Sequence, residues 1–190
     1  MYKAEPDPYC YPGTSILINL LDIRDQAALD AFEADVTAER SSQPLPPGRW
    51  SYRHYLAVHR HLFGDVYAWA GKIRKVRIAK QGHAFCYPEH IDREMRRLFA
   101  DLEMRKRLRG LDSVAFAAYA AHFLAEMNAI HPFREGNGRT QLSFFTALAE
   151  QAGHPVRFDR FEPRTMLDAM IESFEGDEKP LAALIERLIS

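Results

Sequence analysis

One nine-residue stretch gathers the side chains best suited to chemistry. It reads His131-Pro132-Phe133-Arg134-Glu135-Gly136-Asn137-Gly138-Arg139. Histidine has an ordinary pKa of about 6.5, so His131 can accept a proton from a hydroxyl group at neutral pH. Glycines let backbone N–H groups approach an anion closely, and the start of a helix adds a favourable dipole. The stretch therefore combines a general base with a candidate phosphate cradle.

The carboxylate of Glu135 would repel a phosphate bound beside it. Mg²⁺ removes that conflict, because proteins hold it through one or two carboxylates together with substrate phosphates. Asn137 offers an amide donor, and Arg139 offers a fork of donors that suits phosphate oxygens. We therefore predict phosphoryl or nucleotidyl transfer with magnesium. Taken singly, His131 has an ordinary alternative as a helix cap, and Glu135 as an acidic residue near a helix start.

Helices must hold this loop in place. Apolar residues spaced by three and four predict a helix over 112–130, directly before His131, and another over 138–151. Phe133 would then plug the loop into the core. Further helices are predicted at 26–40, 50–63, 88–109, 164–174 and 179–189, with a short one at 15–22. We expect an all-α fold, a helical bundle around a helix–loop–helix active site.

One segment departs from helical spacing. Between residues 73 and 80 apolar and basic side chains alternate, and Gly82 then turns the chain toward residues 84–87. This pattern predicts a small β-hairpin. Its basic side chains have two interpretations: they discourage edge-to-edge aggregation, or they belong to a surface that docks a target. The isolation of the hairpin in a helical domain favours docking. These side chains are Arg74, Lys75, Arg77 and Lys80.

Length and composition limit the class of protein. A chain of 190 residues fits a single domain, 1–190, with an extended arm at 1–14. The formal net charge of −1 argues against direct nucleic-acid binding. Cys10 and Cys86 form no CxxC pair, so we expect neither a disulfide framework nor a thiolate zinc site. No apolar run is long enough to span a membrane and no signal peptide is evident, so we expect a cytoplasmic protein with no membrane partner.

The active-site stretch resembles the signature of Fic domains, HxFx(D/E)GNGRxxR. Three further segments strengthen the resemblance: Tyr11-Pro12-Gly13-Thr14, Phe63 to Gly71, and Phe85-Cys86-Tyr87-Pro88. Together they are similar to the short bacterial class I Fic toxins and to the Fic domains of type IV secretion effectors. The resemblance covers most of the chain. It implies the Fic fold, with residues 72–87 as a β-hairpin flap and 131–139 as the active-site loop.

The same resemblance implies an activity and a role for each site residue. A Fic protein of this kind is a protein adenylyltransferase, which transfers AMP from MgATP to a hydroxyl side chain of a target protein. His131 then matches the base, and Glu135 matches the magnesium ligand. Phosphate binding is implied for Gly136, Asn137, Gly138 and Arg139. The flap is implied to pair with the target as an added strand, through Val76, Arg77, Ile78, Ala79 and Lys80.

The sequence departs from the family pattern in two places. Leu142 stands where the signature has a second arginine, which contacts the terminal phosphate. The inhibitory (S/T)xxxE(G/N) helix of many Fic proteins has only a loose match at 146–151, inside a predicted helix, which we interpret as chance. The resemblance to short toxins therefore implies a separate small antitoxin that carries an SxxxEG-type helix. Type II topoisomerase subunits are targets known for that class.

Two alternative functions stay open at this point. One is a degenerate Fic domain that binds nucleotide or a partner without catalysing transfer, which Leu142 favours and the intact His131 and Glu135 oppose. The other is the Fic domain of a secreted effector.

Overall fold

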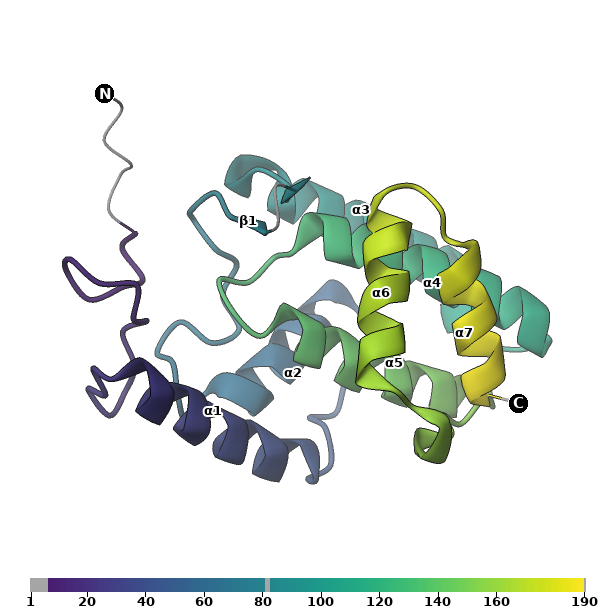
Figure 1. Ribbon diagram of the computed structural model, residues 1–190. Helices are drawn as coiled ribbons and strands as arrows, with labels where there is room; N and C mark the ends of the chain where they lie inside the picture. The colour runs from purple at the N-terminus through teal and green to yellow at the C-terminus, as the bar shows by residue number, and fades with distance from the viewer. Residues whose placement is uncertain (1–6, 81–82, 190) are drawn as a thin grey trace.

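The central element of the fold is α4 (Ser113–Ile130), which directly precedes the active-site loop. The computed structural model describes residues 7–80 and 83–189. Buried apolar side chains lie on nearly every side of α4, so other elements must surround it. The helices α3 (Pro88–Met104), α5 (Asn137–Ala152), α6 (Pro163–Phe174) and α7 (Lys179–Ile189) all pack against it (Figure 1). The predicted all-α fold is confirmed.

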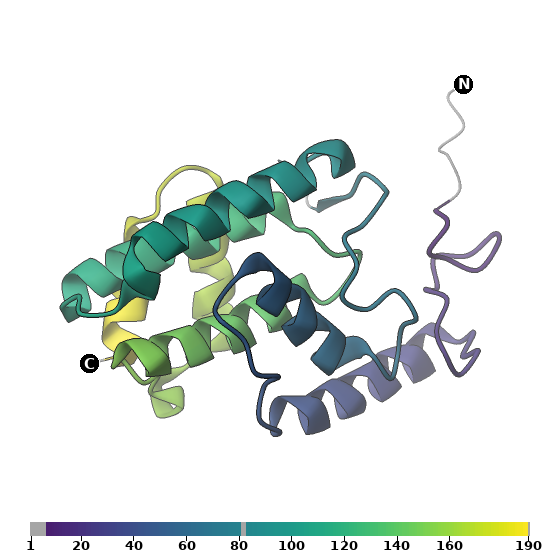
Figure 2. The same ribbon diagram turned by 180° about the vertical axis from the view of Figure 1, so that it is seen from behind.

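Two further helices complete the bundle on the other side of the loop. The helix α2 (Tyr52–Phe63) packs against α5, and α1 (Gln26–Ser41) packs against α2. Figure 1 and the reverse view in Figure 2 both place α1 at the outer edge, across the molecule from α7. A short 3₁₀ helix, η2 (Phe158–Arg160), connects α5 to α6.

Aromatic rings fill the core where α2, α4 and α5 meet. The fully buried Tyr55 stacks on Phe133 with ring centroids 5.6 Å apart and meets Phe144 edge-on at 5.3 Å. Phe133 belongs to the active-site loop and is itself fully buried. The prediction that this ring plugs the loop into the core is therefore confirmed.

Local signals explain where the two helices beside the loop begin and end. The carboxylate of Asp112 accepts a hydrogen bond of 2.8 Å from the Ala115 N–H and caps α4, as its residue type predicts. At the far end of α5, Gly153 takes a left-handed conformation with a φ of 92°, which ends the helix at the predicted place.

The prediction of a short helix over 15–22 is wrong. The Ile18 N–H donates to the Tyr9 carbonyl at 2.8 Å, and the Leu20 N–H donates to the Val66 carbonyl at 2.9 Å. Because these backbone donors are used by the N-terminal arm and by the turn after α2, they are not available for helical bonds. The segment runs along the surface as an irregular loop.

The helix expected over 88–109 ends early, at Met104. The chain continues into η1 (Lys106–Leu108), whose three residues all have positive φ, between 52° and 60°. Leu108 is buried at 1% exposure. Turning its side chain into the core offsets the cost of the left-handed backbone.

The hairpin is shorter than predicted and displaced along the chain. Among the described residues of this segment, β1 (Ala79–Lys80) pairs antiparallel with β2 (His83–Ala84), and one further bond joins the Phe85 N–H to the Ile78 carbonyl at 3.2 Å. Residues 73–78 run beside the active-site loop instead of forming a strand. The Arg74 N–H and guanidinium of this segment bind that loop, as described below.

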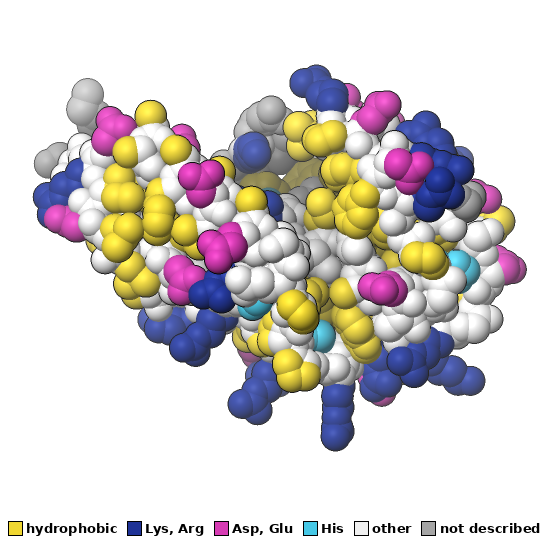
Figure 3. Space-filling view, turned by 90° about the horizontal axis from the view of Figure 1, so that it is seen from below, with side chains coloured by type: hydrophobic (Ala, Val, Ile, Leu, Met, Phe, Trp, Pro, Cys, Tyr) yellow, Lys and Arg dark blue, Asp and Glu magenta, His cyan; other side chains and the backbone are white. Residues whose placement is uncertain are grey.

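Some expectations lie outside the described residues, namely the turn at Gly82 and the arm over residues 1–6. On the face drawn in Figure 3, basic and acidic side chains are both present and intermixed, in keeping with the net charge of −1. The helices within residues 7–80 and 83–189 are too short or too polar to cross a lipid bilayer.

Candidate active site

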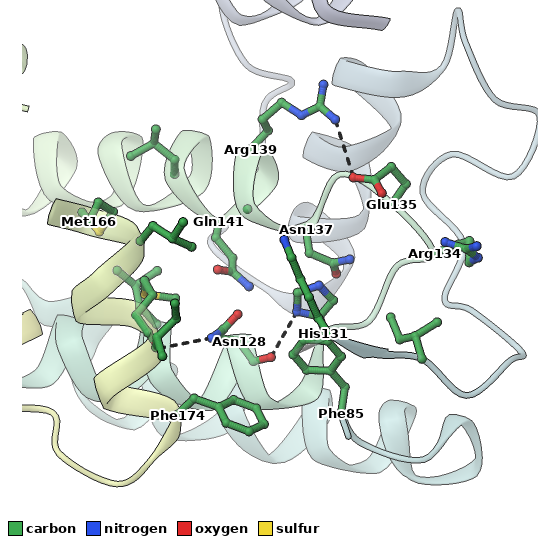
Figure 4. A pocket seen from close by; sticks show the side chains of 18 of the residues that line it. Phe85, Asn128, His131, Arg134, Glu135, Asn137, Arg139, Gln141, Met166 and Phe174 are labelled. Atoms are coloured by element: carbon green, nitrogen blue, oxygen red, sulfur yellow. Dashed lines mark hydrogen bonds and ion pairs between the residues drawn. The ribbon is translucent and has the colours of Figure 1, made fainter. Parts of the chain in front are cut away.

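His131 lies at the point where α4 ends and the loop begins. Its backbone is left-handed, with a φ of 48°, while its N–H still donates to the Met127 carbonyl at 3.0 Å. A non-glycine residue in this conformation is uncommon and often marks a functional site. The ring Nδ1 lies 3.2 Å from the Asn128 carbonyl (Figure 4). When Nδ1 carries the proton and donates it there, Nε2 keeps a free lone pair, as a general base requires.

An aromatic ring covers one face of the His131 imidazole, and a second ring packs against the first. Phe85, which directly follows β2, stacks on it with centroids 3.8 Å apart and ring planes 15° apart, and Phe174 of α6 meets Phe85 edge-on at 5.7 Å. Burial lowers the pKa of His131 to about 4, and the positive charges of Arg74 and Lys80 act in the same direction. The imidazole is therefore neutral at pH 7 and able to take a proton.

Asn137 closes the loop upon itself. Its side chain is buried at 3% exposure, accepts from the Phe133 N–H at 2.9 Å and donates to the Phe133 carbonyl at 2.8 Å. Because both ends of the amide are used in this way, the side chain holds the loop in shape. Any contact of this residue with a phosphate falls to its backbone N–H.

The turn at Gly136 opens α5. Its φ of 79° is left-handed, and a Cβ atom there would lie 2.3 Å from Cζ of Phe63, so only glycine fits. The N–H groups of the following helical turn have no partner within the helix. Asn137 and Gly138, which carry such N–H groups, both line the cavity beside His131. This is the place where the sequence predicts a phosphate cradle.

Glu135 lies at the mouth of the same cavity. Its side chain is 46% exposed, and its carboxylate accepts a hydrogen bond from the Gly136 N–H at 2.8 Å. The part of the chain that the structure describes holds no group of three or more side chains able to cage a metal ion. A single exposed carboxylate beside a phosphate cradle fits Mg²⁺, which keeps most of its ligands from phosphates and water.

Arg139 is held by α1. Its guanidinium pairs with Glu33, donates to the Thr37 hydroxyl at 3.1 Å and lies over the Phe63 ring at 4.7 Å. Glu33 is buried at 9% exposure and also accepts a hydrogen bond from the Tyr67 hydroxyl. The sequence predicts phosphate contacts for Arg139 but gives no sign of this partner. The arginine also lines the cavity, and its guanidinium lies 3.7 Å from the Glu135 carboxylate (Figure 4).

Arg74 contradicts the sequence-based expectation of an exposed flap residue. It is 1% exposed, and its guanidinium donates to the carbonyls of His131 at 2.8 Å and Ile130 at 3.2 Å, while its N–H donates to Pro132 at 2.8 Å. Arg74 therefore fixes the backbone of residues 130–132, where α4 ends and the active-site loop begins. The alternation of residues in this segment does predict the burial of Arg74. Side chains two residues apart in an extended segment point to the same side, so Arg74 points inward with the apolar Val76.

Another buried residue supports the loop from α2. His59 is fully buried and stacks on Phe133 with centroids 3.7 Å apart. Its Nε2 lies 3.0 Å from the Glu135 carbonyl, and its Nδ1 accepts from the Gly71 N–H at 2.8 Å. Burial lowers its pKa to about 4. A neutral His59 with the proton on Nε2 satisfies both bonds, so it fixes the backbone that carries Glu135.

One cavity of about 1050 Å³ is lined by His131, Glu135, Asn137, Gly138 and Arg139. The active-site loop forms a polar end. Of the predicted flap residues, Arg77, Ile78, Ala79 and Lys80 line it, whereas Val76 does not. The opposite end is an apolar wall from α6 and the chain before it. That wall consists of Phe161, Met166, Leu167, Met170 and Ile171.

Comparison with known proteins agrees with this geometry. The model of the Fic/DOC family matches residues 49–149. The chain is 53% identical over 189 residues to the probable protein adenylyltransferase y4lH of Sinorhizobium fredii, covering 99% of this chain and 98% of y4lH. It is 40% identical to the protein adenylyltransferase VbhT of Bartonella schoenbuchensis, covering 98% of this chain but only 40% of VbhT.

Among solved structures, the BepC effector protein of Bartonella tribocorum with bound AMPPNP superposes with a TM-score of 0.84 at 27% identity, covering 95% of each chain. The family match spans more than half of the sequence and includes the active-site loop with His131. This chain belongs to the Fic/DOC family.

Proposed function

We propose that this protein is a protein adenylyltransferase that transfers AMP from MgATP to a hydroxyl side chain of a target protein. The observation that carries the proposal is one cavity that holds a neutral histidine base beside a cradle of backbone N–H groups. Relatives similar along almost the whole chain are named protein adenylyltransferases, and a similar structure binds an ATP analogue. The apolar wall of α6 offers a surface for the nucleobase.

In the proposed reaction, the target hydroxyl oxygen attacks the α-phosphorus of ATP. The new oxygen–phosphorus bond forms as the bond from the α-phosphorus to the β-phosphate oxygen breaks, and pyrophosphate leaves with that electron pair. His131 accepts the hydroxyl proton at Nε2 while its Nδ1–H stays bonded to the Asn128 carbonyl. The N–H groups at the start of α5 hold the phosphates in line with the incoming oxygen.

Glu135 is the residue that would hold Mg²⁺ in this proposal. The ion would neutralise phosphate charge, and the carboxylate lies next to the cradle where such an ion is needed. The flap is proposed to dock the target, since Ile78 and Ala79 lie on the cavity side of a hairpin whose strands are only two residues long. A short open edge suits pairing with an extended segment.

The setting of the reaction is also a proposal. We propose a cytoplasmic toxin restrained by a separate small antitoxin. The 146–151 segment that loosely matches the inhibitory motif lies within α5, with Leu148 and Ala149 buried. Its position agrees with its interpretation as an ordinary part of the core.

The direct test is transfer of AMP from labelled ATP to protein. The purified protein, a bacterial lysate and magnesium should give labelled bands whose peptides carry one added AMP by mass spectrometry. Labelling should fall to background with EDTA or with ATP labelled only at the γ-phosphate. Label retained from γ-labelled ATP would show phosphoryl transfer instead and would contradict the proposal.

Replacing Leu142 by arginine should speed AMP transfer by about ten- to a hundredfold. Leu142 lines the cavity three residues after Arg139, one helical turn away, and Arg139 is engaged by Glu33. A charge-assisted hydrogen bond to the terminal phosphate contributes about 1.5–3 kcal/mol, which corresponds to that gain in rate when it forms in the transition state. Initial rates with saturating target would measure it.

Ser143→Arg is the matched control, because it adds the same charge to the next residue of α5, outside the residues that line the cavity. It should leave the rate within about twofold. An inactive wild type rescued by Leu142→Arg would favour the degenerate, binding-only domain. A fast wild type slowed by the change would mean that another cation, such as Lys80 of the flap, already contacts that phosphate.

A further inference from the structure

Gln141 has an unused hydrogen-bond donor inside the cavity. The residue is 5% exposed and lines the cavity, and its side-chain nitrogen is buried with no partner among the described residues. Buried polar groups in proteins are almost always paired, and an unpaired one calls for an explanation. A bound ligand that accepts this hydrogen bond is the simplest explanation, because the amide lies on the cavity wall.

A second carboxamide faces the same space. Asn128 lines the cavity from α4 and donates to the Met170 carbonyl at 3.5 Å. Figure 4 shows the side chains of Gln141 and Asn128 projecting toward one another from facing helices, beside His131. The two amides together offer N–H donors and carbonyl acceptors to a group placed between them. A hydroxyl group, which donates one hydrogen bond and accepts others, matches such a pair.

The position of Gln141 along α5 indicates which part of a nucleotide it would meet. The phosphate cradle lies at the start of α5, and Gln141 lies about one turn further along, a rise of about 5 Å. The apolar wall formed by Met166, Leu167 and their neighbours on α6 lies beyond it. In a nucleotide the sugar separates the phosphates from the base. Gln141 therefore lies at the level of the sugar when the phosphates occupy the cradle.

We propose that Gln141, assisted by Asn128, binds the ribose hydroxyls of the nucleotide and makes the enzyme prefer ribonucleotides over deoxyribonucleotides. The inference rests on the proposed use of ATP and adds a specificity residue to it. The Gln141 amide donates to a hydroxyl oxygen, and the hydroxyl hydrogen is accepted by a carboxamide oxygen. The nucleobase is left to the apolar wall.

The test compares ATP, 2′-deoxy-ATP and 3′-deoxy-ATP with wild type and Gln141→Met, by calorimetric binding and by AMP transfer. Methionine keeps a similar length without a donor, so the fold should be retained, which circular dichroism would verify. Wild type should prefer ATP over at least one deoxy analogue by about three- to tenfold, the value of one hydrogen bond. Gln141→Met should lose that preference by weakening ATP alone.

Gln151→Met is the matched control, because it makes the same substitution on the same helix, where Gln151 bonds to Arg109 and to the Arg107 carbonyl far from the cavity. It should leave the preference unchanged. A preference that survives in Gln141→Met would overturn the inference. Calorimetric binding of GTP to the same variant provides a further check. If Gln141→Met keeps the preference for ATP over its deoxy analogues but loses the preference for ATP over GTP, Gln141 contacts the base and the inference is overturned.

The outcomes for the two proposals are separable. Transfer of AMP with an unchanged ribose preference in Gln141→Met would refute the role of Gln141 alone. Binding of ATP without any transfer would refute the proposed activity, and the calorimetric preference would still decide the role of Gln141. A wild type that binds no ATP would refute both.

Discussion

Alanine in place of His131 should lower the rate of AMP transfer by about a hundred- to ten-thousandfold, the usual contribution of a positioned general base. The expected loss follows from geometry. Nδ1 is bonded to the Asn128 carbonyl, so Nε2 is the free nitrogen, and burial keeps the ring neutral. Binding of ATP should change little, because the phosphate cradle belongs to α5. Transfer rates and calorimetric ATP binding, measured together, would check this.

His122→Ala is the matched control, since His122 lies on the same helix, is half-exposed and contacts Glu178. It should transfer AMP at the wild-type rate. If His131→Ala and His122→Ala were equally active, His131 would not be the base.

The acid limb of the pH profile provides a second test of the same residue. Because the pKa of His131 is lowered to about 4, the base stays neutral as the pH falls from 7 to about 5, and kcat/KM should be nearly constant over that range. An unshifted histidine would be protonated through a pKa of about 6.5 and lose activity there. A decline centred near that higher value would show that the ring is solvated when the enzyme works.

Alanine in place of Gly136 should destabilise the fold by about 2–5 kcal/mol. A side chain at a φ of 79° costs about 1–2 kcal/mol. The added Cβ would also lie 2.3 Å from a carbon of the fully buried Phe63 ring, and overpacking of this kind costs about 1–3 kcal/mol. For a chain of this size the melting temperature should fall by about 4–20 °C. Thermal unfolding followed by circular dichroism would measure the change.

Gly138→Ala is the control for this prediction. Gly138 lies two residues further on, within α5, and a Cβ atom there meets nothing within 4 Å. Alanine is the better helix former, so this variant should be as stable as wild type or more stable by up to about 1 kcal/mol. Equal melting temperatures for the two variants would mean that the turn at Gly136 can relax.

The sequence predicts well the parts of this fold that depend on local pattern. The helices on either side of His131 follow from apolar spacing, an Asp112 cap and a Gly153 stop, and the structure has all three. The segment over 15–22 has helical spacing too, yet its backbone bonds go to residues far along the chain. Local pattern fails there because distant partners, which it does not include, decide the outcome.

The candidate site divides in the same way. The candidate base, the candidate cradle and the candidate metal ligand lie within nine residues that carry a specific signature, so the sequence is enough to single them out. Glu33 and Gln141 carry no such signature, and Phe85 belongs to a resembling segment that gives no sign of its contact with His131. Their importance arises from what the fold brings beside them, across α1, the flap and the cavity. A contact between residues 106 positions apart, such as that of Arg139 with Glu33, cannot be predicted from the spacing of neighbouring residues.

The salt bridges of the loop arginines bear on how the protein can be divided. Arg139 is held by Glu33, and Arg134 is held by Asp7 at 2.8 Å. Both carboxylates lie before residue 49, where the family match begins. A fragment trimmed to that match would retain the signature but lose Glu33 and Asp7, and the apolar wall of α6 as well. We therefore expect a fragment of residues 49–149 to be less stable than the whole chain, because side chains on both sides of the matched segment hold the loop.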